Sequence, residues 1–242
     1  MLFMLFKQFM RIDRSLTCKH YSGPRPWQKQ WIRAQIYYAL AINIDFMEKS
    51  SDYFILSVAT RDNRVVAKSL ADMINISSIL QRHFVLNVQA GTGIVSSRTK
   101  CIEAIKKWFP GEDRVYTFWL DSDIVLNEKP ETIAEYVKEA ERRNMAFAGN
   151  YHVIDNNTNQ MWNTVAKKHP NHYTNEELAS AKPFELKCEY AGLGLCYINT
   201  PTNYMFRTVG HDLEDMLFFK DNPDIDLRYV PISNVHMKTV YI

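Results

Sequence analysis

Apolar and polar residues alternate in blocks through the middle of this chain, and the blocks predict strands separated by helices. Runs rich in β-branched and aromatic residues indicate strands, at 53–59, 83–88, 116–126 and 145–150. Between them, apolar residues recur at helical spacing, over 65–81, 94–109 and 131–143. Strands and helices in this order predict an α/β fold, with a central, mostly parallel sheet covered by helices on both faces.

Different patterns flank this block. The aromatic and aliphatic residues between Pro24 and Met47 recur at helical spacing and predict one long amphipathic helix. Residues 151–187 predict a long insert over the sheet. Its aromatic residues and histidines suit either a polar, ring-shaped ligand or an ordinary surface excursion. We therefore expect an N-terminal arm and helix over 1–50 and a main domain over 51–242.

The strand predicted at 116–126 carries two carboxylates, Asp121 and Asp123, directly after its longest apolar stretch. Side chains alternate along a strand, so both are expected on one side of it, at the carboxyl end where open α/β sheets bind ligands. Paired carboxylates suit a hard divalent cation, which would in turn hold a diphosphate. The alternative is that both residues form a turn or cap the helix that Pro130 opens.

A second acidic group lies near the end of the chain. Asp212, Glu214 and Asp215 precede an amphipathic helix, and such acids form either a functional cluster or a simple helix cap. His236 and Lys238 follow the last predicted strand, which covers 227–231.

Glycines mark two loops. Gly192 and Gly194 begin a strand, where they permit either the close approach of a ligand or tight packing within the fold. Gly91 and Gly93 follow the second strand, but neither G-x-G-x-x-G nor a P-loop is present. A dinucleotide-binding or ATP-hydrolysing protein is therefore not indicated.

Composition adds limits. With 242 residues, of which 46% are hydrophobic, the chain can bury the core of one large α/β domain, with or without an appendage. The net charge is +2, but residues 1–40 hold seven Lys or Arg against one acid, which leaves the remainder at −4. Because a general nucleic-acid binder shows a basic domain surface, we expect no nucleic-acid partner.

The N-terminus is apolar only as far as Phe6, which is far short of the roughly 20 residues that a membrane span requires. It also lacks the features of a secretory signal, so we expect a cytoplasmic protein. Residues 1–14 then have two interpretations: peripheral contact with anionic lipid, or a terminus that docks or frays.

Cysteines and histidines indicate no metal or redox centre of a familiar kind. The cysteines have the spacing of neither a zinc site nor a C-x-x-C pair, and the histidines fit no familiar metal site. The residues concerned are Cys18, Cys101, Cys188 and Cys196, and His152, His169 and His172.

Taken in order, these motifs resemble the GT-A family of nucleotide-sugar glycosyltransferases. The resemblance covers about residues 51–242 and rests on the following motifs: Thr60-Arg61, Arg98, Leu120-Asp121-Ser122-Asp123-Ile124, Gly192-Leu193-Gly194, Glu214-Asp215 and His236. The compact size is similar to that of small archaeal or viral members, and the Asp-Ser-Asp context to that of fungal mannosyltransferases. The resemblance to the family implies a Rossmann-like, three-layer α/β/α sandwich and a hexosyltransferase with a DXD motif.

The resemblance also implies roles for single residues. Asp123 would bind Mn²⁺ or Mg²⁺ directly, Asp121 would contact the donor ribose or a metal-bound water in the same metal site, and His236 would complete the metal shell or touch the diphosphate. The residues expected to hold the UDP- or GDP-sugar donor are Thr60, Arg61, Arg98, Asp121, Gly192, Gly194 and Lys238.

For catalysis, the resemblance implies that Asp215 removes the proton of the acceptor hydroxyl if the enzyme inverts the anomeric centre, with Glu214 holding sugar hydroxyls. In a retaining enzyme both acids would orient the substrates. The family often has glycine before the Glu-Asp pair, whereas here Leu213 stands there and Asp212 competes for the role of base. The acceptor would be a glycan, a protein or a lipid-linked molecule.

Two other classes remain open. A haloacid dehalogenase-type phosphatase also uses an Asp-x-Asp strand, but it places that strand early, whereas here a complete βαβ unit precedes Asp121. A nucleotide-binding protein that has kept the fold and lost turnover is the third class, since fold alone does not establish function.

Overall fold

The computed structural model describes residues 31–33, 49–60, 64–154, 161–168, 171–210 and 213–236, with backbone only at 31–33, 64, 154 and 236. The chain divides into two units, Met1–Gln30 and Trp31–Ile242. The first unit lies outside the described residues, as do Arg61, Asp212, Lys238 and the proposed lipid contact at 1–14. All described residues therefore belong to the second unit.

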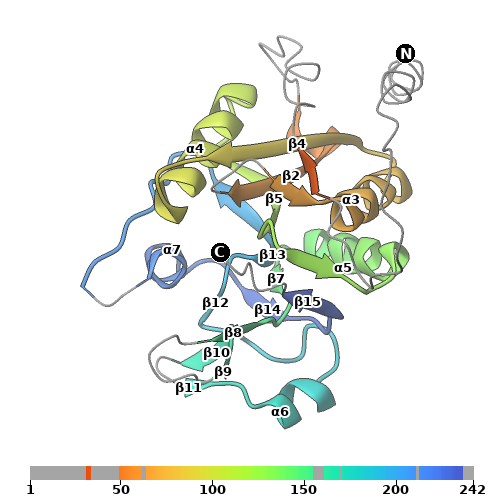
Figure 1. Cartoon of the computed structure of the whole chain (residues 1–242), viewed down its shortest axis with the longest axis vertical. Coiled ribbons are helices and arrows are strands. Elements are labelled where there is room, and N and C mark those ends of the chain that lie inside the picture. Colours follow the sequence, from red (N-terminus) through yellow and green to blue (C-terminus); the bar gives the residue numbers. More distant parts are fainter. Residues whose placement is uncertain are drawn as a thin grey trace, which may run out of the picture. The chain divides into compact units, whose positions relative to one another are not determined.

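A six-stranded sheet forms the centre of this unit, in the order β14-β7-β13-β5-β2-β4 (Figure 1). Its members are β2 (Tyr53–Thr60), β4 (His83–Ala90), β5 (Arg114–Leu120), β7 (Ala146–Ala148), β13 (Leu195–Pro201) and β14 (Leu227–Tyr229). β13 runs antiparallel to both of its neighbours, and the other pairs are parallel. The prediction of an α/β fold with a mostly parallel sheet is confirmed.

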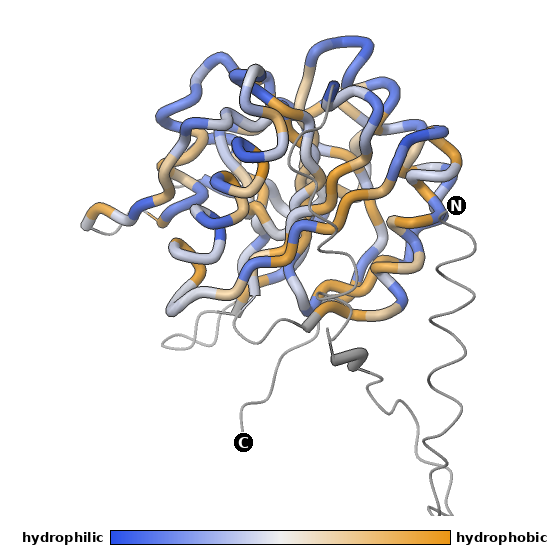
Figure 2. Tube along the Cα trace, turned by 90° about the horizontal axis from the view of Figure 1, so that it is seen from above, coloured by the Kyte–Doolittle hydropathy of each residue, from blue (hydrophilic) through white to orange (hydrophobic). Residues whose placement is uncertain are grey.

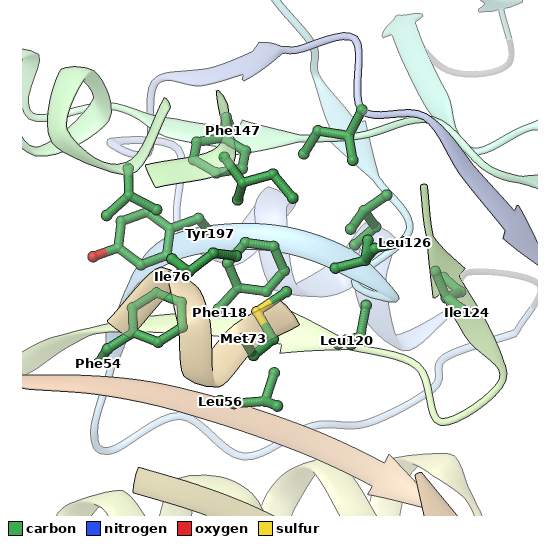
Figure 3. Packing of buried hydrophobic residues seen from close by; sticks show 14 of the residues in the cluster. Phe54, Leu56, Met73, Ile76, Phe118, Leu120, Ile124, Leu126, Phe147 and Tyr197 are labelled. Carbon is green, nitrogen blue, oxygen red and sulfur yellow. The ribbon is translucent and has the colours of Figure 1, made fainter. Parts of the chain in front are cut away.

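Helices pack on both faces of this sheet. Along β2, Phe54 and Leu56 share an apolar cluster with α3 (Ala67–Ile79) and α5 (Pro130–Arg143), whereas Ile55 lies in another cluster with α4 (Ile94–Trp108). Figure 3 shows Met73 and Ile76 of α3 against the strand residues. Each fully buried Leu, Ile or Phe contributes about 1.5–3 kcal/mol relative to an exposed one.

Local sequence explains where α5 begins and ends. Pro130 occupies the first turn, where its missing N–H costs no helical bond, and Glu131 adds a negative charge there. Arg142 and Arg143 lie in the last turn, and Asn144 ends the helix in the left-handed conformation.

The predicted insert contains its own small sheets, drawn at the bottom of Figure 1. β8 (His152–Ile154) and β9 (Met161–Asn163) form a hairpin, and β10 (Val165–Lys168) pairs with both β11 (Asn171–His172) and β12 (Tyr190–Ala191). The short helix α6 (Asn175–Ser180) starts with a capping box between Thr174 and Glu177. β12 then returns the chain toward the central sheet through Gly192.

Two expectations need correction. The strand predicted over 116–126 stops at Leu120. Asp121–Asp123 form a turn, which is closed by a 3.2 Å bond from Ile124 N to Asp121 O. The residues after the turn form a separate strand, β6 (Ile124–Leu126), which pairs with β15 (Asn234–His236). The long helix predicted from Pro24 is wrong at Trp31–Arg33, because these residues form β1, paired with β3 (Arg64–Val66). β-branched residues at 65 and 66 suit this pairing, so α3 begins only at Ala67.

Hydropathy follows this arrangement. Figure 2 shows apolar residues along the central segments and hydrophilic residues mainly at outer turns. Within the described part of the chain, no helix combines the length and the apolar character needed to cross a bilayer.

Candidate functional site

The carboxyl ends of β2, β4 and β5 meet at one edge of the sheet, because these three strands are parallel neighbours. β5 ends at Leu120, and the next residue, Asp121, donates its N–H to Gly194 O at 2.8 Å. The pairing of Leu120 with Leu195 on β13 continues into this bond. The acidic turn is therefore held against the glycine turn that precedes β13.

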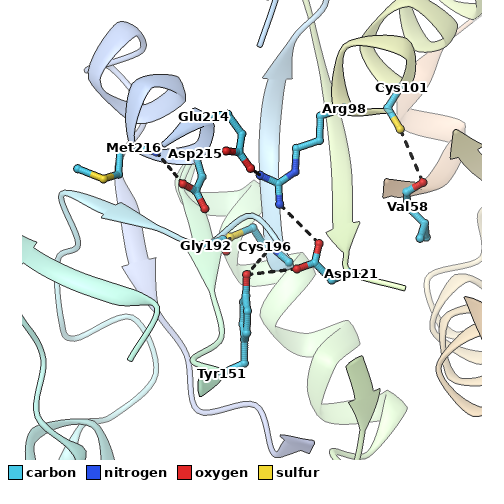
Figure 4. A network of polar contacts seen from close by, with 11 residues as sticks. Val58, Arg98, Cys101, Asp121, Tyr151, Gly192, Cys196, Glu214, Asp215 and Met216 are labelled. Carbon is cyan, nitrogen blue, oxygen red and sulfur yellow. Dashed lines mark hydrogen bonds and ion pairs between the residues drawn. The ribbon is translucent and has the colours of Figure 1, made fainter. Parts of the chain in front are cut away.

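Arg98 connects the two acidic motifs. Its guanidinium donates to Glu214 Oε1 at 2.7 Å and forms an ion pair with Asp121 Oδ1 at 3.5 Å (Figure 4). The residue lies on α4 and is only 3% exposed. Glu214, the first residue of α7 (Glu214–Asp221), is also buried. Acids that are 93 positions apart in the sequence thus share one cation.

A third carboxylate, Asp215, belongs to the same network. Burial would lower the pKa of Arg98, but the charges of Asp121, Asp215 and Glu214 outweigh it, and the pKa is raised above its usual value. Asp215 Oδ1 accepts a bond from Met216 N at 3.0 Å. Figure 4 shows its carboxylate on the same side of α7 as that of Glu214.

Desolvation raises the pKa of Asp215 to about 6; Arg98 opposes this effect, and the neighbouring charge of Glu214 adds to it. Its side chain is nevertheless partly exposed. A carboxyl group with a pKa close to neutrality is suited to accept and release protons at physiological pH. Asp215 is therefore the member of the cluster with the properties of an acid-base residue.

Tyr151 holds Asp121 from the other side. Its buried hydroxyl donates to Asp121 Oδ2 at 3.4 Å and accepts the N–H of Gly194 at 3.1 Å. Burial and the nearby charges of Asp121 and Asp215 raise the pKa of this phenol well above its usual value. It therefore stays neutral and keeps its proton for the bond to Asp121.

Both glycines of the turn are required by this packing. A Cβ built on Gly194 would overlap Asp121 Oδ2, and one built on Gly192 would overlap the hydroxyl of Tyr151. Gly192 O also accepts a bond from Cys196 Sγ at 3.1 Å. Side chains of the protein itself fill the space that these glycines leave. Tight packing within the fold, one of the two expectations for these glycines, is therefore what the structure shows.

Of the other predicted residues, Thr60 and Asp123 lie at or near the same edge. Thr60 is buried at the end of β2, where its carbonyl accepts a bond from Ser97 Oγ at 3.1 Å. Asp123 is partly exposed in the turn. The backbone of His236 is paired with Ile124, the residue after Asp123. The side chain of His236, together with Arg61 and Lys238, lies outside the described residues.

The donor set is compatible with a divalent metal. Asp121 and Asp123 lie in a single turn and carry carboxylate oxygens, the ligands that Mg²⁺ and Mn²⁺ prefer. The register of β15 brings the backbone of residue 236 beside that turn. Among the side chains that the structure describes, no three His, Cys, Asp or Glu residues gather as a metal site. The side chain of His236, the third ligand that the resemblance implies, is not among those described.

Sequence reasoning missed Tyr151. It was counted with the long insert, yet it follows β7 by three residues, and the bond from Gly149 N to Leu195 O at 2.9 Å brings this segment beside Gly194. The available signal was an aromatic residue just beyond the carboxyl end of a predicted strand, where ligands and catalytic groups gather.

No protein-family model matches this chain, and neither the curated proteins nor the solved structures that were searched contain a match. Any function assigned to the site therefore rests on the chemistry of its residues.

Proposed function

We propose that this protein is a metal-dependent glycosyltransferase that transfers a sugar from a UDP- or GDP-sugar to an acceptor hydroxyl. The observation that carries the proposal is the arrangement around Arg98, which brings Asp121 together with Glu214 and Asp215. Such an enzyme needs one group of acids at the donor and another at the acceptor, and the two groups must lie close enough to act on both substrates at once.

The architecture supports this proposal. Asp121 follows the carboxyl end of β5, a strand parallel to β2, where open α/β sheets bind their ligands, and Arg98 ties Glu214 of α7 to it. The sheet is mostly parallel and has helices packed on both faces. We assign it to a three-layer, GT-A-type sandwich as part of the same proposal.

On the donor side, Asp123, Asp121 and His236 would hold Mn²⁺ or Mg²⁺. The metal, when bound, neutralises the negative charge of the departing nucleoside diphosphate. Tyr151 fixes the orientation of the Asp121 carboxylate, and Gly194 provides the room that it occupies. The residues outside the described set, Arg61 and Lys238, would add positive charge near the donor.

On the acceptor side, Asp215 would take the proton of the attacking hydroxyl. Its pKa of about 6 leaves it ionised at neutral pH and still basic enough to accept a proton. The carboxylate of Glu214 instead accepts a hydrogen bond from Arg98. This bond holds it in place, so Glu214 is suited to orienting substrate hydroxyls. These roles describe an inverting reaction; in a retaining one both acids would orient the substrates.

The decisive experiment is hydrolysis of a panel of UDP- and GDP-sugars by the full chain, with and without Mn²⁺. Asp123→Ala should reduce the Mn²⁺-dependent rate at least about a hundredfold, because a direct ligand contributes more than an outer-shell one. Asp113→Ala is the matched control, since Asp113 is an exposed carboxylate next to the opposite end of β5. Equal turnover by the wild type and Asp123→Ala would remove the metal assignment.

Two other outcomes identify the rival classes. Release of phosphate from simple phosphomonoesters, with no sugar release, would indicate a phosphatase. Metal-dependent binding of a nucleoside diphosphate without release of sugar would indicate a binding protein that lacks turnover.

A further inference from the structure

An exposed indole lies on the insert that follows the candidate site. Trp162 belongs to the β8–β9 hairpin and is 44% exposed, and its cross-strand partner Val153 is 41% exposed. Its neighbour Met161 is 62% exposed. Because successive side chains point to opposite faces of a strand, Trp162 and Met161 face different ways.

Aromatic rings connect Trp162 to the interior. The ring of His172 lies 5.8 Å from that of Trp162 at 52°, and the ring of Tyr190 lies 5.8 Å from that of His172 at 89°. Tyr190 Oη and His172 Nε2 are 3.3 Å apart and form a hydrogen bond. Three rings from β9, β11 and β12 thus form a continuous row.

The inner end of this row reaches the candidate site. Tyr190 immediately precedes Ala191 and the Gly192 turn, and it belongs to the same apolar cluster as Phe218 of α7. β12, which carries Tyr190, packs against α7, the helix that carries Asp215. Burial raises the pKa of Tyr190, and the charge of Asp215 raises it further. The row therefore leads from the neighbourhood of Asp215 to the exposed face of Trp162.

Polar bonds fix the strand that carries the indole. Asn163 donates to Tyr173 O at 2.8 Å and to Asn175 Oδ1 at 2.9 Å, and its own Oδ1 accepts a bond from Asn150 at 2.9 Å. These contacts tie β9 both to α6 and to the segment just after β7. Trp162 is thereby presented on an anchored strand, although half of its surface is open.

We propose that Trp162, His172 and Tyr190 form the acceptor subsite and that the acceptor is a carbohydrate. The inference rests on the proposed function. The open face of an indole carries the negative side of its quadrupole and attracts the weakly positive C–H face of a sugar ring. Tyr190 Oη and His172 Nε2 bond to each other and thereby hold the two rings in place behind the indole. A lipid acceptor would require a continuous apolar groove, and this row alternates apolar faces with polar atoms.

Binding can be measured without turnover. Saturation-transfer NMR with a panel of methyl glycosides, such as methyl mannosides, glucosides and galactosides, reports contact with the full-length protein. For a glycoside that binds, Trp162→Ala should raise Kd at least about fivefold, because one aromatic contact contributes ~1 kcal/mol. Trp162→Phe should keep most of the affinity. Met161→Ala is the matched control, because it truncates an even more exposed side chain on the opposite face of β9.

A second measurement does not depend on the folding of the alanine variant. The indole N–H resonance of Trp162, assigned by its loss in folded Trp162→Phe, should shift when a methyl glycoside is added to the wild type. Glycosides that do not shift it, or that bind Trp162→Ala as tightly as the wild type, would overturn the subsite. The same holds if none of the panel binds.

Donor hydrolysis separates this inference from the proposed function. Stimulation of nucleotide-sugar hydrolysis by the glycoside should be lost in Trp162→Ala and kept in Met161→Ala. If no nucleotide-sugar is hydrolysed but a glycoside still binds through Trp162, the proposed function fails and the carbohydrate subsite stands. If donor hydrolysis is present and Trp162→Ala is stimulated as strongly as the wild type, the subsite fails alone.

Discussion

The carboxylate of Asp121 occupies the space that a side chain at position 194 would fill, so that Gly194 and Asp121 determine each other's position. The backbone bond from Asp121 N to Gly194 O reinforces the contact. Tyr151 touches both residues through one hydroxyl group. An aspartate whose backbone and carboxylate are both held in this way has lost most of its freedom before any ligand arrives, which favours a site that is organised in advance.

Gly194→Ala should therefore damage the site with a modest loss of stability. The new methyl group would displace the carboxylate of Asp121, because the overlap involves Asp121 Oδ2 directly. We expect Mn²⁺-dependent hydrolysis to fall at least about tenfold and the free energy of unfolding to fall by about 1–3 kcal/mol. Gly93→Ala is the control, because its Cβ would meet open space and its φ is −170°. Equal activity of the two variants would contradict the packing.

Removing the charge of Arg98 should destabilise the fold strongly. Arg98→Met would leave Glu214 and Asp121 without their shared cation in a buried setting, and breaking such a network costs about 3–5 kcal/mol. Urea unfolding measures the loss. Arg142→Met is the matched control, because Arg142 pairs with Glu139 on an exposed helix surface, so its loss should leave stability nearly unchanged. If Arg98→Met unfolds at the same urea concentration as Arg142→Met, the network does not stabilise the protein.

Much of the fold follows from local patterns. The sequence predicts the first βαβ unit to within a few residues, because each of its elements has its own periodicity of apolar positions. These elements are Tyr53–Thr60, Ala67–Ile79 and His83–Ala90. The antiparallel direction of β13 depends instead on pairing with β5 and β7, which are distant in sequence. Such pairing leaves no local signal.

The acidic turn shows why parts of the site could not be predicted. The run 116–126 is apolar on both sides of Asp121, so that the pattern favours one strand, whereas β6 gains its partner from β15 at the far end of the chain. The ion pairs of Arg98 also join three separate elements. The sequence placed Asp121, Glu214 and Asp215 among functional residues, but tertiary packing decided which of them would share a cation.

Activity should depend on the ionisation of Asp215. The pKa of its carboxyl is raised to about 6, and a general base must be deprotonated, so kcat/KM for transfer should fall as pH drops below about 6. The rate measured between pH 4.5 and 8 tests this. A transfer rate that stays constant from pH 8 down to pH 5 would exclude Asp215 as the base.

The same shift has a consequence for stability. The folded-state pKa of Asp215 is higher than its ordinary value of 3.8, so the folded protein binds this proton more tightly than the unfolded chain. The contribution of Asp215 therefore becomes less favourable as pH rises from about 4 to 6 and stays so above that range. Asp215→Asn should remove this dependence, as urea unfolding at pH 4.5 and 7 would show. An unchanged dependence in the variant would contradict the raised pKa.

Tyr151→Phe should weaken the metal site through the position of Asp121. The variant keeps the ring but removes the hydroxyl that orients Asp121 Oδ2 and accepts the N–H of Gly194. A buried N–H left without a partner costs about 1–3 kcal/mol of stability, and loss of an outer-shell contact should lower Mn²⁺ affinity by about 10–100-fold.

Tyr116→Phe provides the matched control for Tyr151→Phe, because the hydroxyl of Tyr116 makes an exposed bond to Asn144 at 3.3 Å and Tyr116 lies near the start of β5, at the opposite end from the acidic turn. Calorimetric titration of Mn²⁺ into both variants measures the difference. If both tyrosine variants bind Mn²⁺ like the wild type while Asp123→Ala does not, metal binding requires Asp123 but does not require the bond from Tyr151 to Asp121. If Tyr151→Phe alone loses affinity, the phenol acts by holding Asp121, since its own oxygen stays protonated and neutral in this buried position.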